Sequence, residues 1–424
     1  MKKVIQPINK PIQARVNIPG SKSMTNRALL LAALSDGVCE IKDTLISDDT
    51  RAFAEALRQL GIMLRLDETT RTCIIGGASG KFPKKTAAIW CAEAGTLARF
   101  ILAACAASEG EYHFDGERQL CDRPLAPLIK VLRRQGAKFM PENVDKMPFT
   151  VSGADGFSGG EIEVDSSQSG QFLSALLMAA PFSKMPVMLK AREVVSRPYV
   201  DMTCAMMADF GVLVRSMPDS RYYVPTPQRY HARDYVIEPD FSTASYFFAA
   251  AAVTAGRVTI QAVDRKNSLQ GDAAFLEILE KMGCRVIENQ EGLSVEGSAD
   301  LHGVSVNMRD FSDTFMTLAA IAPFAKTATT ITNIGHTRLQ ESDRIKAMHE
   351  GLAKLKIKVE EGPDWLKIYP GTPQGATIDA HNDHRIAMAF SVIGLRTPGV
   401  EIEGAECVAK TCPEFFSMWE LLYG

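Results

Sequence analysis

A run of small and apolar residues recurs six times along this chain, about 70 residues apart, and this restricts the fold more than any other feature. Each copy is rich in alanine and is followed by a glycine- or proline-containing turn and then β-branched residues, a pattern typical of helix, turn and strand. The copies align on one alanine each, at Ala32, Ala103, Ala179, Ala250, Ala319 and Ala389. Because 424 residues exceed what one hydrophobic core usually serves, we expect an α/β chain with two domains of three units.

The alanines predict helices that are buried on nearly every side, because small side chains let neighbouring backbones approach closely. A second, more amphipathic helix is readable in several units. Three examples are TRAFAEALRQLGI, PLAPLIKVLRRQGA and AAFLEILEKMGC. Their last turns run into Gly61, Gly136 and Gly283, each of which we expect to end its helix.

Charge and composition exclude several classes of protein. The formal net charge is −3, so the surface as a whole gives no reason to bind nucleic acid or an anionic membrane. No apolar run is long enough to cross a bilayer, and the N-terminus MKKVIQPINKPIQ has no apolar signal region. Nine cysteines without a CxxC pair indicate reduced thiols rather than disulfides or zinc. We therefore expect a cytoplasmic protein that acts on small molecules.

Polar residues stand at the entrance of each alanine-rich helix, and capping of free backbone N–H groups explains most of them at this stage. Cations are less easily explained there. Lys22, Arg27, Arg99 and Arg385 all fall near the starts of these helices, where positive charge is unfavourable for the helix itself. An anionic ligand bound at the helix N-termini would compensate for that cost.

Two further segments carry concentrated charge. They are ERQLCDRPLAPL, which contains Arg123, and RLQESDRIKAM, which contains Glu341 and Arg344. Either segment alone is typical of a solvated face. Combined with the helix entrances, they would supply cations for two phosphates and a carboxylate, and acidic groups for proton transfer.

Ten motifs, in order from Pro19 to Phe416, resemble those of the 5-enolpyruvylshikimate-3-phosphate synthase family of enolpyruvyl transferases. They are PGSKSMTNRALLLAAL, AGTLARF, DRPLAPL, SGQFLSALLMAAP, SRPYVDMT, EPDFSTASYF, SDTFMTLAA, RLQESDRI, NDHRIAMAF and VAKTCPEFF. The resemblance implies a two-domain, inside-out α/β barrel-like fold built from six βαβαββ units, with the active site in the interdomain cleft. It implies one domain of residues 1–20 with 238–424 and a second of residues 21–237.

The family transfers the enolpyruvyl group of phosphoenolpyruvate to the 5-hydroxyl of shikimate 3-phosphate and needs no metal or organic cofactor. By motif, the resemblance implies roles in proton transfer for Lys22, Asp313, Glu341 and His384. It implies phosphoenolpyruvate ligands at Lys22, Gly95, Arg123, Gln171, Arg344, Arg385 and Lys410. It implies shikimate 3-phosphate ligands at Lys22, Ser23, Arg27, Ser169, Gln171, Ser196, Tyr199, Asp313 and Gln340. A monomer is expected, and retention of Gly95 suggests that the donor pocket admits glyphosate.

The chain departs from the family pattern at Glu93, Phe100, Gly170, His336 and Gln340. His336 and Gln340 would face the acceptor ring, so two other interpretations stay open. One is an enolpyruvyl transferase for another acceptor, such as UDP-N-acetylglucosamine, whose family carries a reactive cysteine before an Arg-Pro pair. Cys121 precedes Arg123-Pro124 here, but its spacing differs, and we interpret it as an incidental thiol. The other is a non-catalytic anion-binding relative.

Overall fold

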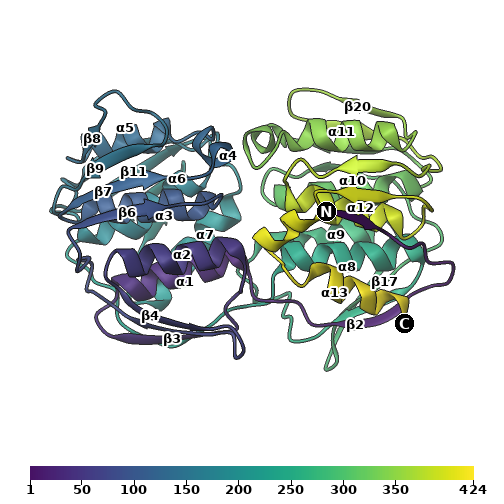
Figure 1. Cartoon of the computed structure of the whole chain (residues 1–424), viewed down its shortest axis with the longest axis horizontal. Helices are drawn as coiled ribbons and strands as arrows, with labels where there is room; N and C mark the ends of the chain where they lie inside the picture. Colours follow the sequence, from purple (N-terminus) through teal and green to yellow (C-terminus); the bar gives the residue numbers. More distant parts are fainter. The chain divides into compact units, whose positions relative to one another are not determined.

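The computed structural model describes residues 1–424, and its contacts divide the chain into two compact units. Unit 1 consists of Met1–Pro19 and Pro239–Gly424, and unit 2 of Gly20–Glu238. The bounds expected from the sequence differ from these by one residue at each crossing. Figure 1 shows the chain coloured along its sequence, with unit 1 containing both termini.

Six buried helices correspond to the six alanine-rich segments, three in each unit. In unit 2 they are α1 (Lys22–Leu34), α3 (Gly95–Ala107) and α6 (Gln171–Ala179). In unit 1 they are α8 (Phe241–Thr254), α10 (Phe315–Ile321) and α12 (His384–Gly394). Every residue of α3, α8, α10 and α12 is buried, which confirms the burial predicted from the small side chains. In unit 2, α3 packs against both α1 and α6.

The second repeat shows the plan of the unit most plainly. Its elements are β6 (Thr86–Trp90), α3, β7 (Glu111–Asp115), the short α4 (Arg118–Cys121), α5 (Ala126–Arg134), β8 (Lys138–Met140) and β9 (Phe149–Ser152). The strand order is β6-β7-β9-β8, with β6 and β7 parallel and the other pairs antiparallel. A buried helix thus connects the parallel pair, as the helix–turn–strand pattern predicts.

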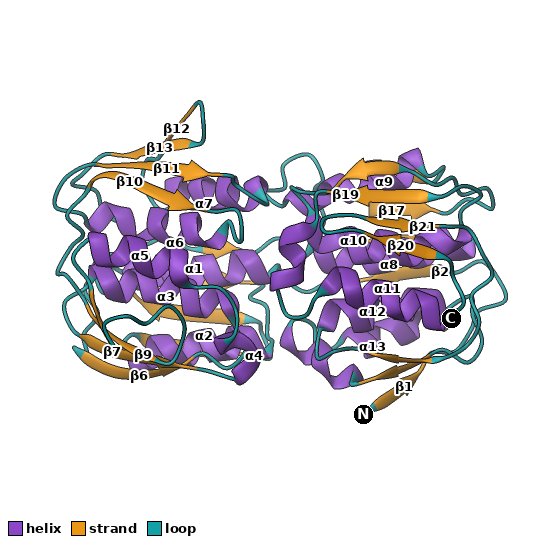
Figure 2. Ribbon diagram, turned by 90° about the horizontal axis from the view of Figure 1, so that it is seen from above, coloured by secondary structure: helices purple, strands orange, loops and turns teal.

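The third and fifth repeats follow the same plan. The third contains β10 (Gly160–Asp165), α6, β11 (Val187–Arg192), α7 (Arg197–Asp209), β12 (Arg215–Met217) and β13 (Arg221–Val224). The fifth contains β18 (Ser305–Asn307), α10, β19 (Thr329–Thr332), α11 (Arg344–Lys354), β20 (Val359–Glu361) and β21 (Leu366–Ile368). Figure 2 shows the helices of unit 2 lying between the sheet of β10, β11 and β13 and the sheet of β6, β7 and β9.

The first repeat of each unit takes its opening strand from a distant part of the chain. In unit 2, β14 (Tyr235–Val236) pairs in parallel with β3 (Val38–Lys42). The sheet continues with β5 (Thr72–Gly76) and β4 (Met63–Asp67), and α2 (Asp48–Gln59) connects β3 to β4 along the chain. In unit 1, β2 (Gln13–Val16) pairs in parallel with β15 (Arg257–Ile260). The sheet continues with β17 (Gly292–Glu296) and β16 (Arg285–Asn289), and α9 (Phe275–Lys281) connects β15 to β16 along the chain. The chain passes from unit 1 into unit 2 and back once, and in each unit one of these pairings completes a four-stranded sheet with a strand from a distant segment.

The sixth repeat departs from the expected plan. Its sheet has three strands, β1 (Lys2–Val4), β23 (Glu401–Glu403) and β22 (Thr377–Asp379). The N-terminal β1 pairs antiparallel with β23 where the other repeats place their own hairpin, and the chain ends in α13 (Phe415–Glu420). Three copies are therefore contiguous βαβαββ units, two take their opening strand from a distant segment, and the sixth pairs β1 with β23 in place of a hairpin of its own.

The glycines expected to end the second helices do so. Gly61, Gly136 and Gly283 follow α2, α5 and α9 with φ of +87°, +106° and +103°, in the left-handed region that glycine adopts without strain. None of the helices combines the length and the apolar character that a membrane span requires.

The close packing of the central helices can be tested at Ala103, which is fully buried in α3. Ala103→Leu adds volume where α3 meets its neighbours, and we expect a loss of about 1–3 kcal/mol in the free energy of unfolding, measured by urea titration. Ala208→Leu, at an exposed position of α7, is the matched control and should change stability by less than about 0.5 kcal/mol. Equal effects at the two sites would contradict the packing argument.

Candidate active site

The N-termini of the six buried helices are mostly not capped by side chains. Only α8 and α12 have such a cap, from Asp240 to the N–H of Thr243 and from Asp383 to the N–H of Arg385. The helices α1, α3 and α10 have none, and at α6 the N-cap residue is a glycine while the preceding Ser169 accepts from the N–H of Gln171. Side chains thus cap at most half of these helices, so the expectation that capping explains most of the polar residues is wrong. None of the six has an acidic residue in its first turn, and the N-termini of α1, α3 and α6, which no carboxylate caps, are suited to an anion.

In unit 2, Lys22 is the first residue of α1, and its amino group lies 3.4 Å from a carboxylate oxygen of Asp49. Asp49 is nearly buried at the start of α2, which begins with a capping box between Ser47 and Thr50. Asp49 is not recognisable as a site residue from the sequence, because two acidic residues after a serine are typical of the first turn of a helix. Its buried position beside Lys22 identifies it as the residue that holds this amino group.

Two guanidinium groups lie over Gly95, at the start of α3. A Cβ atom added to Gly95 would be 2.6 Å from Nη1 of Arg99 and 2.8 Å from Nη1 of Arg123, so a glycine leaves room for both. Arg99 also donates to the side-chain oxygen of Gln171 at 2.7 Å and to the carbonyl of Pro124 at 3.3 Å. The structure therefore brings together Gly95, Arg123 and Gln171, three residues singled out from the sequence, with Arg99 joining them.

The start of α6 explains one departure from the family pattern. A Cβ atom on Gly170 would be 2.6 Å from the backbone oxygen of Val195, so no larger residue fits this backbone. That close approach places Ser169 and Gln171 beside the loop that ends in Ser196, which adopts a left-handed conformation at φ +52° before α7. Ser169 accepts a hydrogen bond from the N–H of Gln171 at 3.3 Å.

Arg27 is buried in α1 and is held by neutral groups. Its Nε donates to Thr203 at 2.7 Å, and its Nη atoms donate to the carbonyls of Ser23 and Tyr199 at 3.0 Å each. Burial lowers the pKa of Arg27 to about 10, and the guanidinium forms no ion pair with a carboxylate. Its charge is therefore not neutralised by the protein, which suits a group that receives an anion.

In unit 1, Arg344 is the centre of a buried network of carboxylates. Its guanidinium contacts Asp383 at 2.8 Å, Glu341 at 2.8 Å and Asp313 at 3.3 Å, and it also donates to Gln340. Burial alone would lower the pKa of Arg344, but the three carboxylates raise it above its usual value. The network fixes Arg344 and presents Glu341 and Asp313 beside a permanent positive charge.

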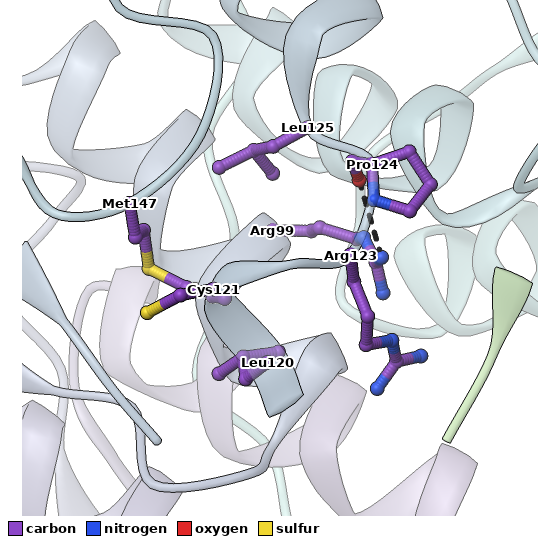
Figure 3. A pocket seen from close by; sticks show the side chains of 8 residues that line it. Arg99, Leu120, Cys121, Arg123, Pro124, Leu125 and Met147 are labelled. Atoms are coloured by element: carbon purple, nitrogen blue, oxygen red, sulfur yellow. Dashed lines mark hydrogen bonds between the residues drawn. The ribbon is translucent and has the colours of Figure 1, made fainter. Parts of the chain in front are cut away.

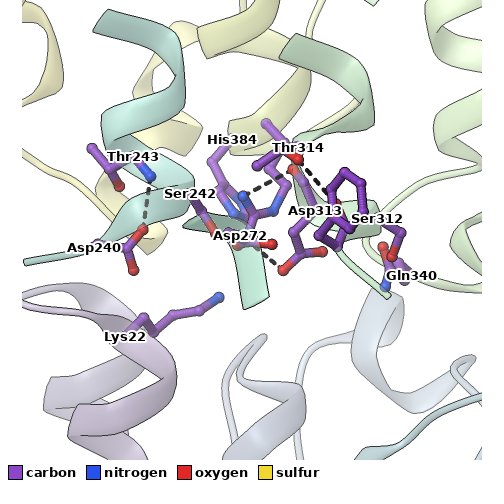
Figure 4. Close-up of polar contacts among 12 residues, drawn as sticks. Lys22, Asp240, Ser242, Thr243, Asp272, Ser312, Asp313, Thr314, Gln340 and His384 are labelled. Atoms are coloured by element: carbon purple, nitrogen blue, oxygen red, sulfur yellow. Dashed lines mark hydrogen bonds and ion pairs between the residues drawn. The ribbon is translucent and has the colours of Figure 1, made fainter. Parts of the chain in front are cut away.

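Asp313 joins the two arginines of unit 1. One carboxylate oxygen accepts from Arg344, and the other accepts from Arg385 at 2.7 Å. Arg385 also contacts the hydroxyl of Ser242 at 3.4 Å, and Ser242 donates to the buried Asp272. Figure 4 shows Asp272 and Ser242 close to Asp313 and His384. Asp272 was missed, since its sequence context, QGD before α9, has no recognisable charge pattern.

His336 and Gln340, the two departures nearest the expected acceptor, are both built into this network. His336 Nε2 lies 2.8 Å from the hydroxyl of Ser312, next to Asp313, and burial lowers its pKa to about 4. Gln340 accepts from Arg344. At neutral pH both side chains are therefore uncharged hydrogen-bonding groups.

The remaining predicted residues of unit 1 are also buried. His384 is the first residue of α12, with Nδ1 3.8 Å from a carboxylate oxygen of Asp383. Lys410 ends the 3-10 helix Ala405–Lys410, which packs against α12. His384 therefore lies beside Asp383, and Lys410 lies on a segment packed against the same helix, α12.

The two charged segments each divide into a structural and a site-facing part. In RLQESDRIKAM, Arg338 contacts Asp343 at 2.8 Å, and Asp343 caps α11, while Gln340, Glu341 and Arg344 join the buried network. In ERQLCDRPLAPL, Arg118 is 95% exposed and Asp122 is 60% exposed, whereas Arg123 reaches Gly95. In both segments, residues that join the site therefore lie within a few positions of residues that are exposed or only structural.

Cys121 lines a small pocket with Arg99, Leu120, Arg123, Leu125 and Met147. Burial, followed by the nearby Asp115, raises the pKa of the Cys121 thiol, which disfavours the reactive thiolate. Figure 3 shows the guanidinium of Arg123 directed away from this sulfur. The surroundings of Cys121 are those of an inert thiol, in agreement with the interpretation from the sequence.

The chemistry available to these groups is acid–base and electrostatic. Fixed guanidinium groups suit phosphate and carboxylate oxygens, and carboxylates beside them can exchange protons with a bound substrate. No group of three or more His, Cys, Asp and Glu side chains in the chain is arranged to hold a metal ion.

A family model described as EPSP synthase (3-phosphoshikimate 1-carboxyvinyltransferase) matches residues 6–419, almost the whole chain. This chain belongs to the EPSP synthase family. The 3-phosphoshikimate 1-carboxyvinyltransferase of Trichormus variabilis is 44% identical over 99% of each chain, and that of Nostoc punctiforme is 45% identical over 97% of each. A solved EPSP synthase structure from Acinetobacter baumannii matches with a TM-score of 0.84 and 25% identity, covering 99% of this chain and 98% of that one.

Membership of the EPSP synthase family confirms the resemblance drawn from the ten motifs. The family's name states a carboxyvinyl transfer to 3-phosphoshikimate, so the chain is a transferase of the shikimate pathway. It also confirms a mixed α/β fold of small sheets and buried helices.

The low pKa of His336 gives stability a testable pH dependence. Between about pH 6.5 and pH 4 the unfolded chain protonates this imidazole and the folded chain does not, so stability falls as the pH falls through this range. His336→Asn removes that titration. We expect its free energy of unfolding, from urea titrations at pH 7 and pH 5, to fall less than that of the unmodified chain.

His302→Asn is the control for this comparison, because His302 is exposed in the same unit. It should keep the pH dependence of the unmodified chain. If stability decreased equally in the His336→Asn variant and in the unmodified chain between pH 7 and pH 5, folding would not lower the pKa of His336.

Proposed function

We propose that two half-sites, the residues around Arg27 and Gly95 in unit 2 and those around Arg344 in unit 1, act on a single pair of substrates, phosphoenolpyruvate and shikimate 3-phosphate. The chain then transfers the enolpyruvyl group to the 5-hydroxyl of the acceptor and releases phosphate. The observation that carries this proposal is the Asp313 carboxylate, which forms ion pairs with both Arg344 and Arg385. Glu341 also forms an ion pair with Arg344. This arrangement combines fixed positive charge with groups that can move protons.

The anionic groups of the two substrates have matching cations in each half-site. Phosphoenolpyruvate is held by Lys22, Gly95, Arg123, Gln171, Arg344, Arg385 and Lys410. Shikimate 3-phosphate is held by Lys22, Ser23, Arg27, Ser169, Gln171, Ser196, Tyr199, Asp313 and Gln340. The contacts that support this are the guanidinium pair over Gly95 and the uncompensated charge of Arg27. Substrate anions would share the guanidinium groups that now contact Asp313 and Glu341.

The reaction requires one proton to be delivered and one to be removed. Protonation of C3 of phosphoenolpyruvate makes C2 electrophilic, and the acceptor hydroxyl loses its proton as it bonds to C2. Glu341 and Lys22 are the candidates for the acid, and Asp313 is the candidate that holds and deprotonates the hydroxyl. Their neighbours Arg344 and Asp49 hold Glu341 and Lys22 in place.

The tetrahedral adduct then loses phosphate, and the C3 proton returns to the base, which regenerates a carbon–carbon double bond. The leaving phosphate needs positive charge that does not have to reorganise. Arg123, Arg344, Arg385 and Lys410 supply it, and the carboxylates around Arg344 keep that group charged and oriented. His384, next to Arg385, is assigned to proton transfer by its position in the motif alone.

The same proposal extends to the assembly and location of the chain. All the residues named above belong to one chain, so a monomer is sufficient for the reaction. Reduced cysteines, a weak net charge and small anionic substrates fit an enzyme that works in the cytoplasm without nucleic acid or membrane partners.

Removal of the candidate acid tests the proton-transfer step. Glu341→Gln keeps the size of the side chain but cannot deliver the proton at neutral pH, and we expect kcat to fall by about 100-fold or more. Steady-state phosphate release with both substrates measures it. Glu350→Gln, at an exposed position of α11, the helix that follows Glu341, should keep near-normal turnover. Near-normal turnover for Glu341→Gln would remove this residue from the mechanism.

The acceptor is tested by comparing two candidates in one assay. We expect phosphate release from phosphoenolpyruvate with shikimate 3-phosphate and not with UDP-N-acetylglucosamine. Cys121→Ser should retain this activity, because the thiol, whose pKa is raised, takes no part. Turnover with the nucleotide sugar, or loss of activity in the Cys121→Ser variant, would favour the alternative acceptor. Absence of phosphate release with both acceptors would favour a non-catalytic anion-binding protein.

A further inference from the structure

Two arginines of unit 2 rest on the faces of buried aromatic rings. The guanidinium carbon of Arg27, in α1, lies 5.1 Å from the ring centroid of Phe100, in α3. The guanidinium carbon of Arg99, in α3, lies 5.5 Å from the ring centroid of Phe172, in α6. Both rings have no exposed surface. The three central helices are thus joined in series by two cation–π contacts.

Buried aromatic rings are suited to hold these cations in a way that carboxylates are not. A carboxylate beside Arg27 would neutralise its charge and compete with a bound anion, whereas the ring stabilises the cation and leaves its charge available. Arg27 donates to neutral groups of four residues, Thr203, Ser23, Tyr199 and Ser174, and has no carboxylate partner. In unit 1 the corresponding task is done by acids, since Arg344 is surrounded by three of them.

The rings also serve different ends of the proposed site. Phe100 supports Arg27, which is placed on the acceptor side, and Phe172 supports Arg99, which lies with Arg123 over Gly95 on the donor side. The two helices that meet at Phe100 are further joined by a buried hydrogen bond of 2.6 Å from Asn26 to Thr96.

We propose that Phe100 and Phe172 are positioning residues that hold Arg27 for the acceptor anion and Arg99 for the donor phosphate. This rests on the proposed function, which places Arg27 on the acceptor and Gly95, Arg123 and Gln171 on the donor, and Arg99 is placed on the donor side because it contacts these residues. Neither ring touches a reacting atom. Their effect is on binding, each through one arginine, and is separable by substrate.

The test is a crossed comparison of Michaelis constants. Phe100→Leu should raise KM for shikimate 3-phosphate by about three- to tenfold and leave KM for phosphoenolpyruvate within about twofold. Phe172→Leu should do the reverse. Phe100→Tyr, which keeps the ring, should retain a KM for the acceptor close to that of the unmodified chain. Phe100→Met, which fills the space without a ring, should resemble Phe100→Leu.

Combination with Arg27→Gln distinguishes the possible failures. If Arg27→Gln leaves KM for the acceptor unchanged, the proposed acceptor role of Arg27 is wrong. If Arg27→Gln raises it but Phe100→Leu does not, the positioning role of Phe100 is wrong. In the double variant, Phe100→Leu should add no further increase, as expected for two residues that act as a unit. A Phe100→Leu variant that changes both Michaelis constants equally, or lowers only the melting temperature, would show a purely structural ring.

Discussion

Positive charge buried at the entrances of helices is the constraint on which the rest of the structure depends. A helix N-terminus disfavours a cation, and burial disfavours any charge, so each such arginine needs local support. Unit 1 supports Arg344 and Arg385 with the carboxylates of Asp313, Glu341 and Asp383. Unit 2 supports Arg27 and Arg99 with neutral hydrogen-bond acceptors and aromatic rings. The two solutions leave unit 1 rich in acid–base groups, and leave Arg27 of unit 2 without a carboxylate partner.

The alanine-rich helices make this arrangement possible. Because α3, α8, α10 and α12 are buried throughout, the groups on their first turns are placed by packing on all sides rather than by one face. Gly95 and Gly170 extend the same principle to the backbone, since a Cβ atom at either position would collide with an arginine or a carbonyl oxygen. Small residues in the core and at the helix ends therefore serve the same purpose, which is to let large charged groups lie close together.

Much of the site can be predicted from local sequence, and its failures share one cause. The helices, the glycine caps and the cations near the helix starts follow from periodicity and residue type. The number of side-chain caps was overestimated, because Ser21 and Thr314 have the right identity but not the capping geometry. Asp49 and Asp272 were missed because their partners, Lys22 and Ser242, lie about 30 residues away and no local pattern links them. Contacts of this kind exist only once the helices are packed.

The sequence by itself determined the repeat, the family and the set of cations, since these depend on the order and spacing of residues along one chain. Only the tertiary structure decided how each charge is compensated, because that depends on distances between different helices. It also decided how incomplete repeats are completed, with β2, β14 and β1 each pairing with a strand from a distant segment. Pairing between strands is made by backbone N–H and C=O groups, which are nearly the same in every residue. The local sequence of a strand therefore does not identify its distant partner.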